Sequence, residues 1–110
     1  MSTYERKIPL KCDCPLERTL NAISGKWKPA LISELLRGTV RLRDLEKMND
    51  EASKRTLAQQ LGELVEDGLV ERKDYHEYPK RVEYSMTLLG KELAEVVNIL
   101  SDFGEKLENV

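Results

Sequence analysis

Residues 53–68 have the sequence SKRTLAQQLGELVEDG, which predicts one well-delimited amphipathic helix. Ser53 is a favourable N-cap because its hydroxyl can accept a hydrogen bond from an unpaired N–H of the first turn. The apolar residues recur at helical spacing, at Leu57, Leu61, Leu64 and Val65. Asp67-Gly68 ends the pattern. The helix therefore has an apolar inner face and begins with a basic, polar turn.

The flanking residues predict a helix before this one and a hairpin after it. Leu42, Leu45 and Met48 indicate a short helix, and residues 49–52 form the turn. Two β-like runs, 69–75 and 81–86, enclose His76-Glu77-Tyr78-Pro79 as the hairpin tip. Thr87 caps a final helix over residues 87–110. This order is that of a winged helix-turn-helix, an α+β, mainly α fold with a two-stranded wing.

Two further helices are expected upstream. The first begins near Pro15 and ends at Gly25, with an apolar stripe of Leu16, Leu20 and Ile23. The second ends at Gly38 and carries Pro29 in its first turn. Its inward-facing residues are Trp27, Leu31, Ile32, Leu35 and Leu36. Residues 39–41 allow only a brief strand, residues 1–13 form an N-terminal arm, and residues 1–110 make one domain.

Composition narrows the class of protein. The chain has 110 residues, 40% hydrophobic and 35% charged, and its apolar runs are too short to cross a membrane. The N-terminus lacks an apolar core of the signal-peptide type, so we expect a cytoplasmic protein without a membrane partner. Although the net charge is −2, residues 26–55 carry eight basic against five acidic side chains, while residues 83–110 carry two against six. Phosphate binding depends on local charge, so the middle of the chain is the candidate DNA face.

The polar start of the 53–68 helix supplies candidate DNA-binding residues. With Leu57 as the buried reference, Arg55 and Gln59 fall at about 160° and 200°, on the outer face. Arg suits guanine and Gln suits adenine, so these two are predicted to contact bases. Lys54 and Thr56 are predicted to hold phosphates. The remaining candidates are Gln60, which lies nearer the core, and Lys80 and Arg81 beside the wing tip.

Two other interpretations of these residues stay open. A short polar helix start is commonly a solvated face, although its place in a helix-turn-helix followed by a hairpin favours DNA binding. Winged helices also serve as protein-docking modules that bind no DNA.

Several segments together resemble HxlR-type transcriptional regulators, relatives of MarR. They are residues 14–20 (CPLERTL), 25–27 (GKW), 57–61 (LAQQL), Leu64, 67–70 (DGLV), Arg72, 79–87 (PKRVEYSMT) and Gly90. The resemblance covers about residues 12–107 and implies a sequence-specific regulator that binds double-stranded DNA as a homodimer. Ala52 departs from the isoleucine usual in the family, and Lys54-Arg55-Thr56 is more basic than in many members. A two-fold dimer would pair two recognition helices about 34 Å apart on a pseudo-palindromic operator.

The final helix carries a heptad seam that predicts a dimer interface. Its members, with those of the first helix, are Leu16, Leu20, Leu93, Val96, Val97, Leu100, Phe103 and Leu107. A seam of about two and a half heptads also serves for packing on the parent domain, so that alternative stays open. Val97 and Ile99 widen the apolar face beyond the needs of a single domain, which favours a homodimer.

The two cysteines, Cys12 and Cys14, are separated by one residue, which disfavours a mutual disulfide. Cys14 precedes Pro15 at the predicted helix N-cap, where the helix dipole favours a thiolate and hence sensitivity to oxidants or electrophiles. The family resemblance points the same way, since several of its members use the matching cysteine as a switch. An inert cysteine retained by the fold is the alternative.

Enzymatic and metal-binding functions find no support in the sequence. It has no Gly-rich phosphate loop or Ser/His/Asp order, and its one histidine is His76. The carboxylates Glu63, Glu66 and Asp67 are expected on a solvated helix face. We therefore expect no catalytic residue, no metal and no cofactor.

Overall fold

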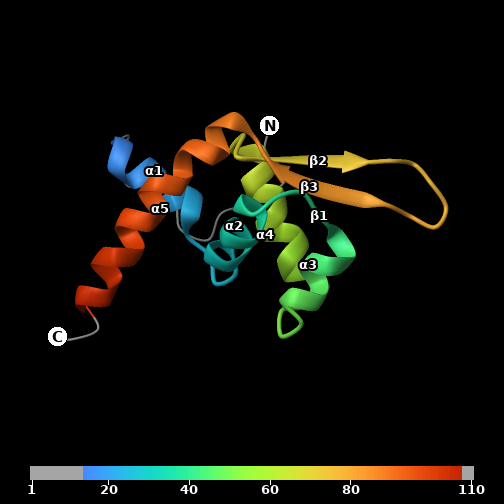
Figure 1. Cartoon of the computed structure of the whole chain (residues 1–110), viewed down its shortest axis with the longest axis horizontal. Coiled ribbons are helices and arrows are strands. Elements are labelled where there is room, and N and C mark those ends of the chain that lie inside the picture. The colour runs from blue at the N-terminus through green and yellow to red at the C-terminus, as the bar shows by residue number, and fades with distance from the viewer. Residues whose placement is uncertain (1–13, 108–110) are drawn as a thin grey trace.

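The computed structural model describes residues 14–107. Its elements are α1 (Pro15–Ile23), α2 (Lys28–Leu36), β1 (Val40–Arg41), α3 (Leu42–Met48), α4 (Lys54–Glu66), β2 (Val70–Asp74), β3 (Val82–Met86) and α5 (Leu88–Leu107). This order confirms the predicted winged helix-turn-helix with a long final helix (Figure 1). The predicted arm, Cys12 and the last three residues of the predicted final helix lie outside the described residues.

The wing belongs to a three-stranded antiparallel sheet. The spatial order is β1-β3-β2, so the brief strand expected at residues 39–41 forms one edge. Along β3, Val82, Tyr84 and Met86 are buried while the residues between them are half-exposed. This confirms the alternation predicted from the sequence. β2 and β3 are slightly shorter than the runs 69–75 and 81–86 that predicted them.

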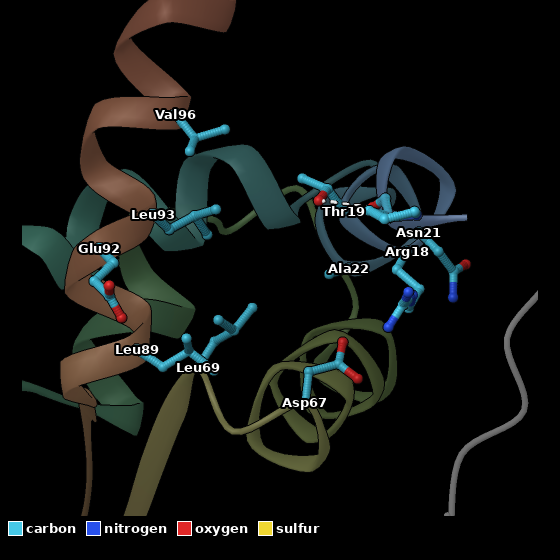
Figure 2. Close-up of a pocket in the computed structure, with 11 residues that line it drawn as sticks. Arg18, Thr19, Asn21, Ala22, Asp67, Leu69, Leu89, Glu92, Leu93 and Val96 are labelled. Carbon is cyan, nitrogen blue, oxygen red and sulfur yellow. Dashed lines mark hydrogen bonds between the residues drawn. The ribbon is translucent and has the colours of Figure 1, made fainter. Parts of the chain in front are cut away.

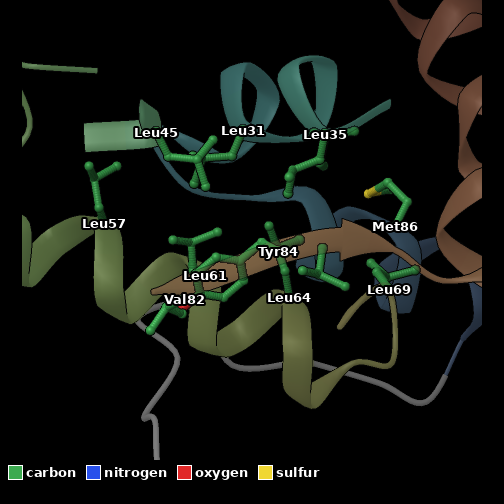
Figure 3. Packing of buried hydrophobic residues seen from close by; sticks show 12 residues of the cluster. Leu31, Leu35, Leu45, Leu57, Leu61, Leu64, Leu69, Val82, Tyr84 and Met86 are labelled. Carbon is green, nitrogen blue, oxygen red and sulfur yellow. The ribbon is translucent and has the colours of Figure 1, made fainter. Parts of the chain in front are cut away.

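The core lies between α2, α4 and the inner face of the sheet. Leu31 and Leu35 of α2 face Leu61 and Leu64 of α4, with Tyr84 of β3 beside them (Figure 3). All four leucines have at most 1% of their surface exposed. Burial of each such side chain stabilises the fold by about 1.5–3 kcal/mol. The leucines of the 53–68 segment are therefore the part of this core that α4 contributes.

The two glycines predicted to stop α1 and α2 follow the helix C-caps directly. α1 ends at Ile23 and α2 at Leu36, and Gly25 and Gly38 come two residues later, both with positive φ. Gly25 has a further role, because its φ is +148° and an added Cβ would lie 2.9 Å from Oε1 of Gln60. A side chain at position 25 would therefore be both strained and crowded.

α5 is joined closely to the body at its first turn. Thr87 caps the helix as predicted: its Oγ1 accepts a hydrogen bond from the Gly90 N–H at 3.0 Å and donates to the Gly68 carbonyl at 2.6 Å. Gly90 packs so closely that an added Cβ would lie 2.1 Å from the Leu69 carbonyl oxygen. Beyond this junction α5 runs away from the sheet and past α1 (Figure 1).

Candidate nucleic-acid interface

The start of α4 is fixed by its cap. The Ser53 Oγ accepts a hydrogen bond from the Thr56 N–H at 3.0 Å and also donates to the Thr56 hydroxyl at 2.9 Å. The N-cap prediction is thereby confirmed. Lys54 and Arg55 follow as exposed residues, and no ion pair joins either of them to another side chain within residues 14–107. Two cationic side chains are therefore presented together at an ordered helix end.

The rest of the predicted α4 set divides between two faces. Gln59 is half-buried beside the exposed Arg55 face. Gln60 lies on the other side: its Oε1 accepts a hydrogen bond from the Trp27 N–H at 2.9 Å. That contact ties α4 to the start of α2, so the structure removes Gln60 from the outward-facing candidates. The helical angle of about −60° from Leu57 was the sequence signal for this position.

A buried ion pair supports α4 from behind and corrects the expectation for Glu63. Lys28 is fully buried and its Nζ donates to the Glu63 Oε1 at 2.5 Å. Glu63 is 8% exposed, so it lies inside the molecule rather than on a solvated face. Thr56, Gln60 and Glu63 share one side of α4, at i, i+4 and i+7. The bonds of Gln60 and Glu63 to Trp27 and Lys28 fix how α4 sits against α2, and the sequence patterns did not predict them.

A second polar contact holds α3 to α2. Asn49, 4% exposed, donates from its amide to the Glu34 Oε1 and to the Leu45 carbonyl, both at 2.9 Å. The helix-turn-helix is thus fastened to α2 on both its helices. Such bonds fix the direction of a helix more sharply than apolar packing does, because each requires a defined donor and acceptor.

The wing holds one of its two predicted cations in an internal network. Arg81 donates from Nε and Nη2 to the Glu83 Oε2 at 3.0 and 2.9 Å, and its guanidinium lies 4.2 Å from the Tyr75 ring centre. These bonds raise the pKa of Arg81 above its ordinary value. Lys80, by contrast, is exposed. Arg81 therefore stiffens the wing, and Lys80 is the freer of the two for an external contact.

Two carboxylates of the wing have lowered pKa values. The pKa of Glu83 is held below its ordinary value chiefly by the hydrogen bond from the Tyr75 hydroxyl, at 2.8 Å, and then by Arg81. The pKa of Asp74 is lowered chiefly by the His76 backbone N–H, which donates to it at 2.8 Å. Both groups are therefore anionic at neutral pH and offset part of the positive charge of the hairpin.

The apolar residues predicted for a dimer interface divide into two sets. Leu93 and Val97 are half-buried and pack against the core. The others are exposed on α1 and α5: Leu16, Leu20, Val96, Leu100, Phe103 and Leu107. Phe103 alone has 56% of its surface exposed. The packing alternative thus accounts for two seam residues and leaves the larger part of the seam uncovered.

An open hollow of about 960 Å³ separates α1 from α5. Figure 2 shows Leu93 and Val96 of α5 pointing across it toward Thr19 and Ala22 of α1. Leu69 contributes to its base. The lining mixes these apolar residues with polar and charged ones, among them Arg18 and Glu92, and Val96 is its one member from the exposed seam.

Cys14 occupies the predicted N-cap of α1. Its Sγ accepts a hydrogen bond from the Glu17 N–H at 3.4 Å, and the residue is a half-buried free cysteine. Within residues 14–107, no group of three or more His, Cys, Asp or Glu side chains has the arrangement of a metal site. In the same range, no helix is both long and apolar enough to cross a membrane.

Comparison with protein families shows to which family this chain belongs. Residues 22–110 match the family model of the HxlR-like helix-turn-helix. The chain belongs to this family. YybR of Bacillus subtilis (strain 168), an HTH-type transcriptional regulator, is 37% identical over 110 residues, which cover all of this chain and 88% of YybR. The HxlR-like assignment makes the chain a transcriptional regulator of helix-turn-helix type.

Solved structures agree with the HxlR-like assignment. The redox regulator HypR in its reduced form superposes with a TM-score of 0.80 at 37% identity, covering 88% of this chain and all of that one. A MarR-family structure from Porphyromonas gingivalis W83 superposes with a TM-score of 0.77 at 32% identity, covering 96% of this chain and all of that one. The fold predicted from the sequence is therefore that of known regulators.

Proposed function

We propose that the chain binds double-stranded DNA sequence-specifically as a homodimer, with α4 in the major groove and the wing on the flanking backbone. The observation that carries this is the capped start of α4, where Lys54 and Arg55 are exposed together without an ion-pairing partner among the described residues. The hairpin and the α3–α4 turn project from the same body on either side of α3 (Figure 1). This spacing suits a groove and its adjacent backbone.

The exposed seam on α1 and α5 supports the homodimer. Its residues are apolar over several turns of α5, and a surface of this kind is typical of a subunit interface. A two-fold axis near α5 would relate the two α4 helices to each other. The site would then be a pseudo-palindrome.

Arg55→Ala tests base recognition. The proposed operator is sought by footprinting the protein on genomic DNA fragments, and binding is then measured by fluorescence anisotropy. The variant is expected to lose about 1–3 kcal/mol of operator affinity and to relax preference at one base pair. Lys91→Gln, which removes one exposed charge from α5, is the control and should bind as the parent does. Unchanged affinity and base preference in Arg55→Ala would overturn the proposed orientation.

We further propose that Cys14 makes DNA binding responsive to oxidants. The thiol is half-buried at the α1 N-cap, beside the surface assigned to the dimer, and HypR, a relative in fold, is a redox regulator. Mild hydrogen peroxide is expected to change operator affinity of the parent and of Cys12→Ser, and to leave Cys14→Ser unchanged. An equal response in all three proteins would assign the effect to another group and leave Cys14 as an inert cap.

A winged helix that docks onto a protein instead remains the competing function. The salt dependence of binding to the footprinted fragment distinguishes DNA binding from protein docking. DNA binding through phosphates weakens steeply and linearly in log units as salt rises, whereas a docking module would show no such binding to the footprinted fragment.

A further inference from the structure

Arg41, at the end of β1, carries a buried donor that nothing in the fold satisfies. The residue is half-buried, and its Nε is buried without a hydrogen-bond partner anywhere in residues 14–107. A buried donor on a charged group without an acceptor is costly, and such exceptions call for an explanation. The Arg41 guanidinium therefore has hydrogen-bonding capacity that the described residues leave unused, and other parts of the residue line two surface hollows.

The nearest carboxylate in the sheet is already engaged. Arg41 lies directly opposite Glu83 in the β1–β3 register. The two oxygens of Glu83 accept hydrogen bonds from Tyr75 and Arg81. On the other side of Glu83, its register partner is Lys73 of β2. The outer face of the sheet carries two carboxylates, Glu71 and Glu83. Its three cations, Arg41, Lys73 and Arg81, outnumber them.

Arg41 also lies between two surface hollows. One, of about 570 Å³, is lined by Arg41, Arg81 and the wing-tip residues Glu77, Tyr78 and Pro79. The other, of about 150 Å³, lies between α3 and the start of β3. Its lining consists of Arg41, Leu42, Arg43, Glu46, Lys80 and Val82. The smaller hollow thus gathers three cations from three elements against one carboxylate, Glu46.

We infer that Arg41, Arg43 and Lys80 form a binding site for a backbone phosphate of DNA. The inference rests on the proposed DNA binding and adds a contact between α3 and the start of β3, next to the hairpin loop. A guanidinium donates to phosphate through a planar pair of N–H groups, and a second arginine and a lysine add charge without demanding a particular base. The site holds the backbone that runs between α4 and the wing, and it contributes affinity rather than sequence preference.

Because the contact is independent of sequence, the test uses a fluorescein-labelled 30-base-pair duplex of random sequence, titrated from 50 to 200 mM NaCl. Each phosphate contact contributes a slope of about −0.9 in a plot of log K against log salt. Arg41→Gln removes one of the three cations at this phosphate, so it is expected to reduce the slope by up to about 0.9 and the affinity by up to about eight-fold at 0.1 M salt for each bound protomer. Arg43→Gln and Lys80→Gln should reduce both in the same direction. Lys91→Gln, the single-charge control on α5, should retain the parent slope.

The outcomes separate this site from the wider proposal. A parent-like slope in Arg41→Gln, with Arg55→Ala still losing operator preference, overturns the phosphate site and leaves DNA recognition standing. An equal loss in Lys91→Gln also overturns it, since general charge would then explain the effect. If Arg41→Gln fails to fold, the exposed Lys80→Gln decides in its place, and an unchanged slope there overturns the site. If the parent binds neither the random duplex nor genomic fragments, the proposed function falls and the site with it.

Discussion

Leucines in two halves of this molecule have opposite fates. In the compact half formed by α2, α3, α4 and the sheet, Leu31, Leu45 and Leu61 have no exposed surface. On α5, Leu100 and Leu107 are 40% and 58% exposed. Leucine side chains are buried within the chain in the compact half. On α5 they are exposed, where a second protein surface could cover them. Changes in the compact half should therefore affect folding at any concentration, whereas changes on α5 should affect association.

The largest expected effect is in the compact half. Glu63→Ala removes the partner of the fully buried Lys28 and leaves an uncompensated charge among apolar side chains. Breaking a buried pair in this way typically costs about 3–5 kcal/mol. The free energy of unfolding in urea measures it. Glu66→Ala, an exposed neighbour on the same helix, should stay within about 0.5 kcal/mol of the parent. A comparable small loss in both variants would mean that the pair contributes nothing specific.

Phe103→Asp tests the other half. A charge placed in the exposed seam should separate the proposed dimer, so that light scattering reports 12.7 kDa, the mass of one chain. The unfolding temperature of the parent should rise with protein concentration, and that of the variant should not. Asn98→Asp adds the same charge to the opposite side of α5 and should leave the mass of the dimer unchanged. A parent that is monomeric at micromolar concentration would contradict the homodimer.

The smallest effect is expected in the wing, on the side of the sheet that faces away from the core. Tyr75→Phe removes the main cause of the lowered Glu83 pKa, so that pKa should rise toward its ordinary value. In the parent, the folded pKa lies below the unfolded one. The bond therefore contributes fully above the unfolded pKa, and its contribution is lost as pH falls through the folded pKa. Carboxyl-carbon NMR titration follows Glu83 directly. Tyr78→Phe, at a fully exposed tyrosine, should leave its titration unchanged.

Local patterns in the sequence were sufficient to predict the helices and strands. The Ser53 cap and the leucines after it placed α4 to within one residue, because capping and helical spacing depend on neighbours along the chain. For the same reason, Thr87 predicted the start of α5 and the alternation along β3 predicted the hairpin.

Local patterns could not predict contacts between residues that are far apart in the sequence. Lys28 and Glu63 are 35 positions apart, and both are residue types that are ordinarily exposed. Gln60 is a predicted DNA contact because it belongs to the start of α4, although its helical angle points toward the core. Arg81 is predicted from its place beside the wing tip, and its pairing with Glu83 depends on strand geometry that periodicity does not give.

The close packing at Gly90 fixes the direction in which α5 leaves the body of the molecule. A helix of 20 residues, such as α5, is about 30 Å long. If α5 pivoted by about 10° at its first turn, its far end would move about 5 Å, which exceeds the rise of about 3.4 Å between successive base pairs. A methyl group at position 90 would require this first turn to shift, because the added Cβ would lie 2.1 Å from the Leu69 carbonyl oxygen. In the proposed dimer, the absence of a side chain at position 90 would thereby help to fix the spacing of the two half-sites.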